Sequence, residues 1–295
     1  MTSKTIAFIG VGVMGGAMAS HLAKAGYSLR LFNRTKEKVN QWLKLNPGYV
    51  ATSISEACDG ADYVITCVNT VAEVREVILG DSGALASMPT GSMIIDHSTT
   101  APSLSRAIYD QAQSKNIYAF DAPVSGGAEG ARLGTLVCMV GGDAGKFDDL
   151  KKVSSSYCKL IKLMGGAGIG NQTKLVNQLC IAGVLAGISE GLSYGKSAEV
   201  DLSLALPLLI QGAAGSWQMQ HRGETILENK FNHGFSIKNM VKDLELFLDA
   251  CGDTKSNYPN ALEVLRRYKQ LCELGNSELD TSSLILSYNN NPQSN

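Results

Sequence analysis

The stretch TIAFIGVGVMG, residues 5–15, decides the fold of the first half of this 295-residue chain. It begins with a short apolar run typical of a buried strand, and Gly10, Gly12 and Gly15 then stand in the spacing GxGxxG. A helical pattern that includes Met18 follows at once. A strand, a glycine-rich turn and a helix in this order favour dinucleotide binding, because the turn lets a pyrophosphate approach the helix N-terminus. An ordinary glycine-rich turn is the alternative.

The end of the second apolar run indicates which dinucleotide is bound. The sequence there is FNRT, with Asn33 where an acidic residue would bind the ribose hydroxyls of NAD, and Arg34 next. An arginine pairs with a 2′-phosphate, which an acidic residue would repel. We therefore expect NADP(H) to be preferred and NAD(H) to be possible, unless Arg34 is only a solvated residue at a helix start. The predicted cofactor-binding residues of these two segments are Gly10, Gly12, Val13, Met14, Gly15, Asn33, Arg34 and Thr35.

Short apolar runs alternate with amphipathic helical segments from residue 4 to about residue 164. The runs are TIAFIG (5–10), SLRLFN (28–33), DYVITCVN (62–69), SMIIDHS (92–98), IYAFDAP (117–123) and TLVCMVGG (135–142). Each is apolar on both faces, as in strands of the parallel type. The alternation predicts a doubly wound, mainly parallel sheet with right-handed crossovers, which is an α/β domain over residues 1–164.

Helical periodicity replaces the strand runs after Gly170. The predicted helices are 171–199, 203–213, 221–229, 236–251, 258–274 and 281–287. An all-helical C-terminal domain is therefore predicted over residues 165–295, linked to the first domain through the long first helix. The small residues of that helix, Ala182, Gly183, Ala186 and Gly187, would let another helix approach closely. This pattern suits a helix at a domain or subunit interface, and we expect a homodimer or homotetramer without a symmetry fixed by the sequence.

Composition narrows the kind of partner. The formal charge is −1, from 26 basic and 27 acidic residues, so neither nucleic acid nor an anionic membrane is an expected partner. A small molecule is the better expectation. The longest apolar run, residues 179–188, has about half of the ~20 residues that a bilayer requires, and it is predicted to be a buried helix. Because the first strand pattern begins at Ile6, we expect no targeting peptide and a cytoplasmic location.

The cysteines and histidines give no metal site. Seven cysteines occur without a CxxC pair and are expected to be reduced core residues. The four histidines, at positions 21, 97, 221 and 233, show no HExxH or other metal spacing. We therefore predict that no metal is bound.

Two further loops follow predicted strands at their carboxyl ends, where ligands bind in open α/β sheets. The loop DHSTTAPS, 96–103, offers hydroxyl groups. The loop that begins DAPVSGG, 121–127, offers the hydroxyl of Ser125 and the unobstructed N–H groups of Gly126 and Gly127. Such donors can converge on a carboxylate, so these three residues are the candidate substrate-binding residues. A flexible loop without a ligand is the alternative.

A polar patch opens the long helix in the stretch GGAGIGNQTKLVNQ, residues 165–178. Lys174 and Asn177 share a helix face with Asn171 and Gln178. A desolvated ammonium has a lowered pKa and exchanges a proton near neutral pH, so Lys174 is the candidate general acid/base and Asn177 the residue that orients the reacting oxygen. A solvated helix face is the alternative.

The chain resembles the β-hydroxyacid dehydrogenase family, which includes 3-hydroxyisobutyrate dehydrogenase and tartronate, glyoxylate and succinic semialdehyde reductases. The resemblance covers nearly the whole chain and rests on five motifs in the right order. They are IGVGVMGGAMASHLAKAG (9–26), DHSTTAPS (96–103), DAPVSGGAEGARLGTLVCMVGG (121–142), GGAGIGNQTKLVNQ (165–178) and FNHGFSIKNMVKDL (231–244). It implies an N-terminal Rossmann domain, a helical C-terminal domain and an active site in the cleft between them.

The same resemblance implies roles for single residues. Lys174 would be the catalytic acid/base with Asn177 as its helper, and residues 125–127 would bind the substrate carboxylate. Ser98 and Thr99 would lie near the nicotinamide, Val68 and Asn69 would line the cofactor, and Lys242 would approach it from the helical domain. Lys242 and its neighbour Asp243 also suit an ordinary solvated pair.

The sequence thus predicts an NAD(P)-dependent enzyme with NADP preferred. It would transfer a hydride between the nicotinamide and a small carboxylate-bearing 3-hydroxy acid or its semialdehyde. One alternative is a non-catalytic, regulatory dinucleotide-binding subunit, although the combination of Lys174, Asn177 and Ser125 argues against it. The other is an enzyme like 6-phosphogluconate dehydrogenase, whose helical region is much larger than the one predicted here.

Overall fold

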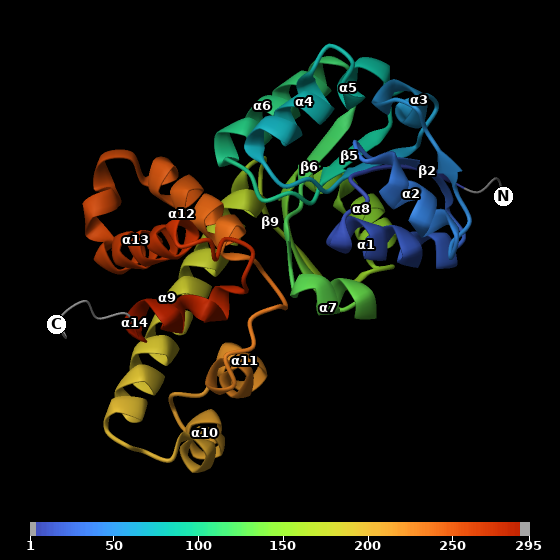
Figure 1. Cartoon of the computed structure of the whole chain (residues 1–295). Helices are drawn as coiled ribbons and strands as arrows, with labels where there is room; N and C mark the ends of the chain where they lie inside the picture. The colour runs from blue at the N-terminus through green and yellow to red at the C-terminus, as the bar shows by residue number, and fades with distance from the viewer. Residues whose placement is uncertain (1–3, 290–295) are drawn as a thin grey trace. The chain divides into compact units, whose positions relative to one another are not determined.

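The computed structural model describes residues 4–289 (Figure 1). The chain divides into two compact units between Lys174 and Leu175. This division falls inside helix α9, Ile169–Ser197, which therefore contributes its first turns to the N-terminal unit and the rest to the C-terminal unit. Each unit is described by itself below.

The N-terminal unit is built on one nine-stranded sheet, in the order β3-β2-β1-β4-β5-β6-β8-β7 with β9 paired to β8. Strands β1 to β6 pair in parallel, so their carboxyl ends lie at one edge of the sheet. The strands are β1 (Thr5–Ile9), β2 (Ser28–Phe32), β3 (Tyr49–Val50), β4 (Tyr63–Thr66), β5 (Met93–Asp96), β6 (Tyr118–Asp121), β7 (Val124–Ser125), β8 (Leu136–Gly142) and β9 (Cys158–Gly165).

Helices cover both faces of this sheet, because alternate residues of each strand point to opposite sides. In β1, Ile6 and Phe8 enter one apolar core, while Ala7 and Ile9 enter the other. The first core is closed by α1 (Val13–Lys24), α2 (Lys36–Leu43), α7 (Gly127–Leu133) and α8 (Phe147–Ser154). The second is closed by α3 (Ile54–Cys58), α4 (Val71–Leu79), α5 (Ala84–Ser87) and α6 (Pro102–Ser114). A short 3-10 helix, η1 (Ala144–Lys146), precedes α8. The predicted doubly wound α/β fold is confirmed.

Two details of the sheet differ from the sequence prediction. The run 135–142, expected to be a parallel strand, forms β8, which runs parallel to β9 but antiparallel to β6 and β7. An apolar run buried on both faces carries no information about direction, so the pattern could not decide this. Strand β9 was missed because it is only partly buried, with exposed lysines at Lys159 and Lys162 among its apolar residues.

The C-terminal unit is all-helical, as predicted. Besides the later turns of α9, it contains α10 (Leu202–Gln211), α11 (Trp217–Leu227), α12 (Ile237–Cys251), η2 (Gly252–Asn257), α13 (Pro259–Glu273), η3 (Thr281–Ile285) and α14 (Leu286–Asn289). Leu185 of α9 and Leu244 of α12 are fully buried in its main core. Helix α11 begins four residues before the predicted start, because the Ser216 hydroxyl caps it by accepting from the Met219 N–H (3.1 Å).

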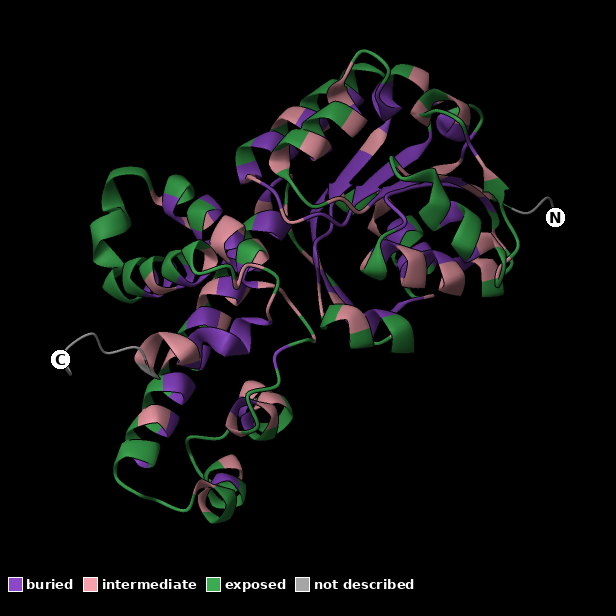
Figure 2. Cartoon of the chain, in the orientation of Figure 1, coloured by how far each residue is buried: buried purple, intermediate pink, exposed green. Residues whose placement is uncertain are grey.

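Helix α9 is less buried than its composition suggested. Among the described residues, it alone is long and apolar enough to cross a membrane, a test that core helices of soluble proteins also pass. Exposed positions recur along it (Figure 2). Cys180 is exposed and Val184 is 37% exposed, so the run 179–188, predicted to be a buried helix, is buried on one side only, at Ala182, Leu185 and Ile188. Cys180 is likewise not a core residue, whereas Cys58, Cys138 and Cys158 are buried.

Candidate active site

The glycine-rich turn after β1 leaves the N-terminus of α1 open. Gly10 has a φ of +99°, and a Cβ there would overlap the Cys67 carbonyl oxygen, while one on Gly15 would overlap the Gly10 carbonyl. Only glycine therefore fits at these two positions. A Cβ on Gly12 would meet no atom within 4 Å, and no side chain caps α1. The backbone N–H groups of the first turn, beside the exposed Val13, can thus bind an anion such as pyrophosphate.

Asn33, the residue directly after β2, connects this strand to the glycine-rich turn. Its Oδ1 accepts from the Val11 N–H (3.0 Å), and its Nδ2 donates to the Thr35 carbonyl (2.9 Å). The side chain thereby joins the end of β2 to the glycine-rich turn. The structure gives this predicted cofactor residue a role in shaping the loop.

Arg34 points into solvent but has a carboxylate partner. Its side chain is 85% exposed and pairs with Glu73 of α4 at 3.0 Å. Glu73 also accepts from the N–H groups of Asn69 (3.1 Å) and Thr70 (3.2 Å), in a capping box at the start of α4. A 2′-phosphate at Arg34 would therefore share the guanidinium with Glu73 or displace it.

The loops after β4 and β5 are tied together at the same sheet edge. The Ser98 hydroxyl accepts from the Val68 N–H (3.0 Å). The Asp96 carboxylate at the end of β5 accepts from the Ser98 N–H (3.0 Å) and from the Thr66 hydroxyl (2.7 Å). Val68 and the loop that contains Thr99 thus lie together beside the glycine-rich turn.

The predicted carboxylate cradle begins at the end of a two-residue strand. Ser125 ends β7 and is half-buried, and Gly126 and Gly127 follow with φ angles of +134° and +63°. Helix α7 starts there and is held at its other end by His21 of α1, whose Nε2 lies 3.1 Å from the Ala131 carbonyl. The cradle is therefore supported from the helix that also forms the nucleotide end of the site.

Lys174 belongs to the N-terminal unit and is only 7% exposed. One turn before it, the buried Asn171 side chain accepts from the Thr100 N–H (3.0 Å) and donates to the Ser105 hydroxyl (3.0 Å). Asp121 accepts from the N–H of Asn171 (2.7 Å). The first turn of α9 is thus fixed to the carboxyl ends of β5 and β6, and Lys174 follows it.

Asn177 and Lys242 lie in the helical unit and share a hydrogen-bond network. Asn177 Nδ2 donates to Gln178 Oε1 (2.8 Å), and Gln178 Nε2 donates to Asp243 Oδ2 (2.7 Å). Lys242 Nζ lies 3.1 Å from Asp243 Oδ1. Because Asp243 is 1% exposed, the second polar pair is not an ordinary solvated one. The structure brings together two predicted site residues from α9 and α12.

Sequence reasoning gave no role to three buried titratable residues at the same edge, Asp96, His97 and Asp121. His97 Nδ1 lies 2.6 Å from the Ala122 carbonyl and Nε2 lies 2.7 Å from the Tyr157 hydroxyl. Burial lowers the pKa of His97 to about 4, although the bond to Ala122 opposes this shift, so the ring is neutral at physiological pH. Their position at the carboxyl ends of strands, in DHS and DAP, was the available signal.

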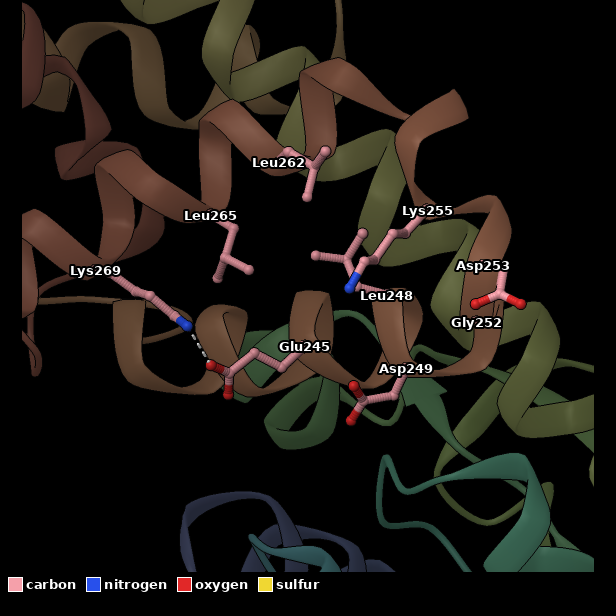
Figure 3. A pocket seen from close by; sticks show the side chains of 9 residues that line it. All are labelled: Glu245, Leu248, Asp249, Gly252, Asp253, Lys255, Leu262, Leu265 and Lys269. Carbon is pink, nitrogen blue, oxygen red and sulfur yellow. Dashed lines mark ion pairs between the residues drawn. The ribbon is translucent and has the colours of Figure 1, made fainter.

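A cavity in the helical unit is lined by other residues than these. It has a volume of about 630 Å³ and lies in the helical unit, open between α12 and α13 (Figure 3). Glu245 and Lys269 form an ion pair at its rim (2.6 Å), and apolar residues such as Leu248 and Leu265 line it. None of the predicted site residues lines this cavity. Within residues 4–289, no group of three or more His, Cys, Asp or Glu side chains could hold a metal ion.

Comparison with known proteins gives two family matches that together span nearly the whole chain. Residues 5–166 match the NAD binding domain of 6-phosphogluconate dehydrogenase, and residues 168–288 match the domain described as NAD-binding of NADP-dependent 3-hydroxyisobutyrate dehydrogenase. An uncharacterized oxidoreductase of Shewanella frigidimarina is 41% identical over 95% of this chain and 96% of its own length. The NAD-dependent L-serine dehydrogenase of Pseudomonas aeruginosa is 32% identical over 95% of this chain and 96% of its own length.

A solved structure agrees with these matches. The 3-hydroxyisobutyrate dehydrogenase of Mycobacterium tuberculosis, in a structure with L-serine, has a TM-score of 0.87 and 28% identity, and the match covers 97% of this chain and 99% of that one. Its similarity extends over both units. The chain therefore belongs to the β-hydroxyacid dehydrogenase family of NAD(P)-binding oxidoreductases, of the 3-hydroxyisobutyrate dehydrogenase type.

Proposed function

We propose that this chain oxidises a small 3-hydroxy acid to its semialdehyde, or catalyses the reverse reduction, with NADP(H) preferred over NAD(H). A bound nicotinamide would accept or supply the hydride. In oxidation, neutral Lys174 takes the proton of the substrate hydroxyl. In reduction, its ammonium gives a proton to the developing alkoxide. Acid/base assistance by a positioned side chain contributes ~100- to 10,000-fold to the rate.

The burial of Lys174 is the observation that carries this proposal. Lysine side chains are seldom this buried, since desolvating an ammonium is costly. Lys174 is 7% exposed and follows a first turn whose polar groups are bound to the carboxyl ends of two strands. A lysine that only kept a surface solvated would not need such support. Asn177 is proposed to orient the reacting oxygen, and its network with Gln178 and Asp243 would hold it in place.

The proposed substrate carries a carboxylate. Ser125, Gly126 and Gly127 supply a hydroxyl and N–H donors, and a Cβ on Gly127 would meet no atom within 4 Å, so a ligand can approach it closely. Two relatives have names or structures that include L-serine, which is itself a small 3-hydroxy acid. The NADP preference is supported by Arg34 and by the lack of an acid at position 33.

Replacement of Lys174 tests the mechanism. Lys174→Ala is expected to lose nearly all turnover while still binding NADPH, as measured by steady-state assay and by fluorescence titration. Lys196→Ala is the matched control, because this lysine is exposed near the other end of the same helix. Normal turnover of Lys174→Ala would rule out the acid/base role.

A substrate panel tests the rest of the proposal. Serine, 3-hydroxyisobutyrate, threonate, glycerate, glyoxylate and succinic semialdehyde are each assayed with both nicotinamides in the appropriate oxidation state. Turnover of one or more hydroxy acids or semialdehydes is expected, faster with NADP(H). Absence of turnover across the panel would favour the non-catalytic alternative.

We also propose that the protein is a cytoplasmic homodimer or homotetramer. The proposed assembly is supported by α9, because Val176, Cys180, Val184 and Tyr194 are exposed along this helix. Exposed apolar side chains of this kind are typical of surfaces that meet another chain. Light scattering coupled to size-exclusion chromatography gives the mass in solution, and a monomer near 31.3 kDa would contradict this assignment.

A further inference from the structure

Asp121 binds the first turn of α9 directly. The residue ends β6 and is 5% exposed. Its Oδ1 accepts from the Gly168 N–H (2.8 Å) and its Oδ2 from the Asn171 N–H (2.7 Å). The first N–H groups of a helix have no partner within the helix, so a carboxylate at this place satisfies two of them and also complements the helix dipole.

The backbone around this contact is packed too closely to shift. A Cβ on Gly170 would overlap the carbonyl oxygen of Asp121 and lie 2.6 Å from that of Met139. From the other side, the Asn171 side chain binds the Thr100 N–H and the Ser105 hydroxyl. The helix start is therefore held against β6, β8 and the loop after β5.

Lys174 is three residues beyond Asn171, on the same helix face and ~4.5 Å further along the axis. All these residues belong to the N-terminal unit. A rigid helix transmits any displacement of its first turn to the next one. A misplacement of ~1 Å at a reacting group can cost ~100-fold in rate.

We infer that Asp121 is a positioning residue for Lys174: its carboxylate fixes the first turn of α9 and thereby the place of the amine. The inference rests on the proposed function. The ionised form is the one that accepts with both oxygens, so the role requires a charged carboxylate inside the protein.

Asp121→Asn tests the inference, because the amide keeps the shape but offers only one acceptor oxygen. We expect kcat to fall 10- to 100-fold while the Kd for NADPH changes less than about threefold. Hydrogen exchange should also become faster at the amides of residues 168–174. The matched control is Asp280→Asn, since Asp280 is 3% exposed and also accepts from backbone N–H groups, those of Phe235 (2.9 Å) and Ser282 (3.0 Å). It should lose stability but keep kcat.

The outcomes separate the two proposals. If Lys174→Ala is inactive and Asp121→Asn retains its kcat, the positioning role is wrong and the acid/base role stands. If Lys174→Ala turns over normally, the acid/base role is wrong, and the positioning role, which rests on it, is wrong as well. Should Asp121→Asn not fold, wild-type hydrogen exchange decides: the Gly168 and Asn171 amides must be as protected as those of the central strand β5. Rapid exchange there would overturn the inference.

Discussion

Replacing His97 with Asn should remove a loss of stability that the N-terminal unit suffers as the pH falls from 7 to 5. His97 is buried and neutral, and burial lowers its pKa from 6.5 to about 4. The unfolded state therefore binds a proton that the folded state does not, at pH values between these two. The contribution of His97 to the free energy of unfolding is fully present above pH 6.5 and is lost as the pH falls toward 4. Between pH 7 and pH 5 the loss is ~2 kcal/mol.

Asp121 acts in the opposite direction over the same range. Burial raises its pKa from 3.8 to about 6, although the N–H donors of Asn171 and Gly168 oppose the shift. A raised folded-state pKa contributes stability that is present below 3.8 and is lost as the pH rises through 6. Lowering the pH from 7 to 5 therefore adds ~1 kcal/mol. In the wild-type protein the two contributions largely cancel.

His97→Asn removes one contribution and leaves the other. The amide can still reach the Ala122 carbonyl but does not titrate. The change in unfolding free energy from pH 7 to pH 5 should then differ between variant and wild type by ~2 kcal/mol, with the variant gaining relative stability at pH 5. All other titrating groups contribute equally to both proteins and drop out of this difference.

Urea unfolding measured by tryptophan fluorescence provides the assay. Both proteins carry Trp217→Phe, so that the signal comes from Trp42, which is 8% exposed in the N-terminal unit. An independent check is an NMR titration of the histidine rings, in which His97 must stay neutral at pH 5. Equal pH dependence in the two proteins, or a His97 ring that titrates near 6.5, would refute the reasoning.

Two further variants test the cofactor end of the site. Arg34→Ala should weaken NADPH much more than NADH in fluorescence titrations, whereas equal losses would contradict the NADP preference. Gly15→Ala should abolish binding of both nicotinamides or prevent folding, since the added Cβ overlaps the Gly10 carbonyl; normal titration curves would contradict the tight packing of this turn. Gly12→Ala separates a loss of binding from a loss of folding, because its Cβ meets no protein atom within 4 Å and should interfere only with the ligand.

The fold could be predicted because its signals are local. The GxGxxG turn follows a strand and precedes a helix, and each helical segment carries its own periodicity. Residues close together in the sequence were therefore sufficient to predict these elements. The direction of β8 was not predictable, since a buried run looks the same in both directions. Strand β9 alternates irregularly between exposed and buried residues and gave no clear pattern.

The candidate site was predictable only in part. Loops such as 96–103 and 121–127 stood out because they follow strands. The roles of Asp121 and His97 depend on partners far away in the sequence: Asp121 binds Asn171, 50 residues later, and His97 contacts Tyr157, 60 residues later. A single sequence does not show which distant groups meet. Whether a carboxylate lies at the surface or caps a helix inside the protein depends on these distant partners.

The exposed Cys180 makes α9 suitable for attaching a spectroscopic probe. All seven cysteines lie within the described residues, and Cys180 is the single exposed one among them. A buried thiol such as Cys58, whose pKa burial raises to about 12, is mostly protonated and reacts slowly with a maleimide. A dye at Cys180 would lie six residues, or ~9 Å along the helix, from Lys174. Its labelling rate at increasing protein concentration would also reveal whether a second chain covers this face.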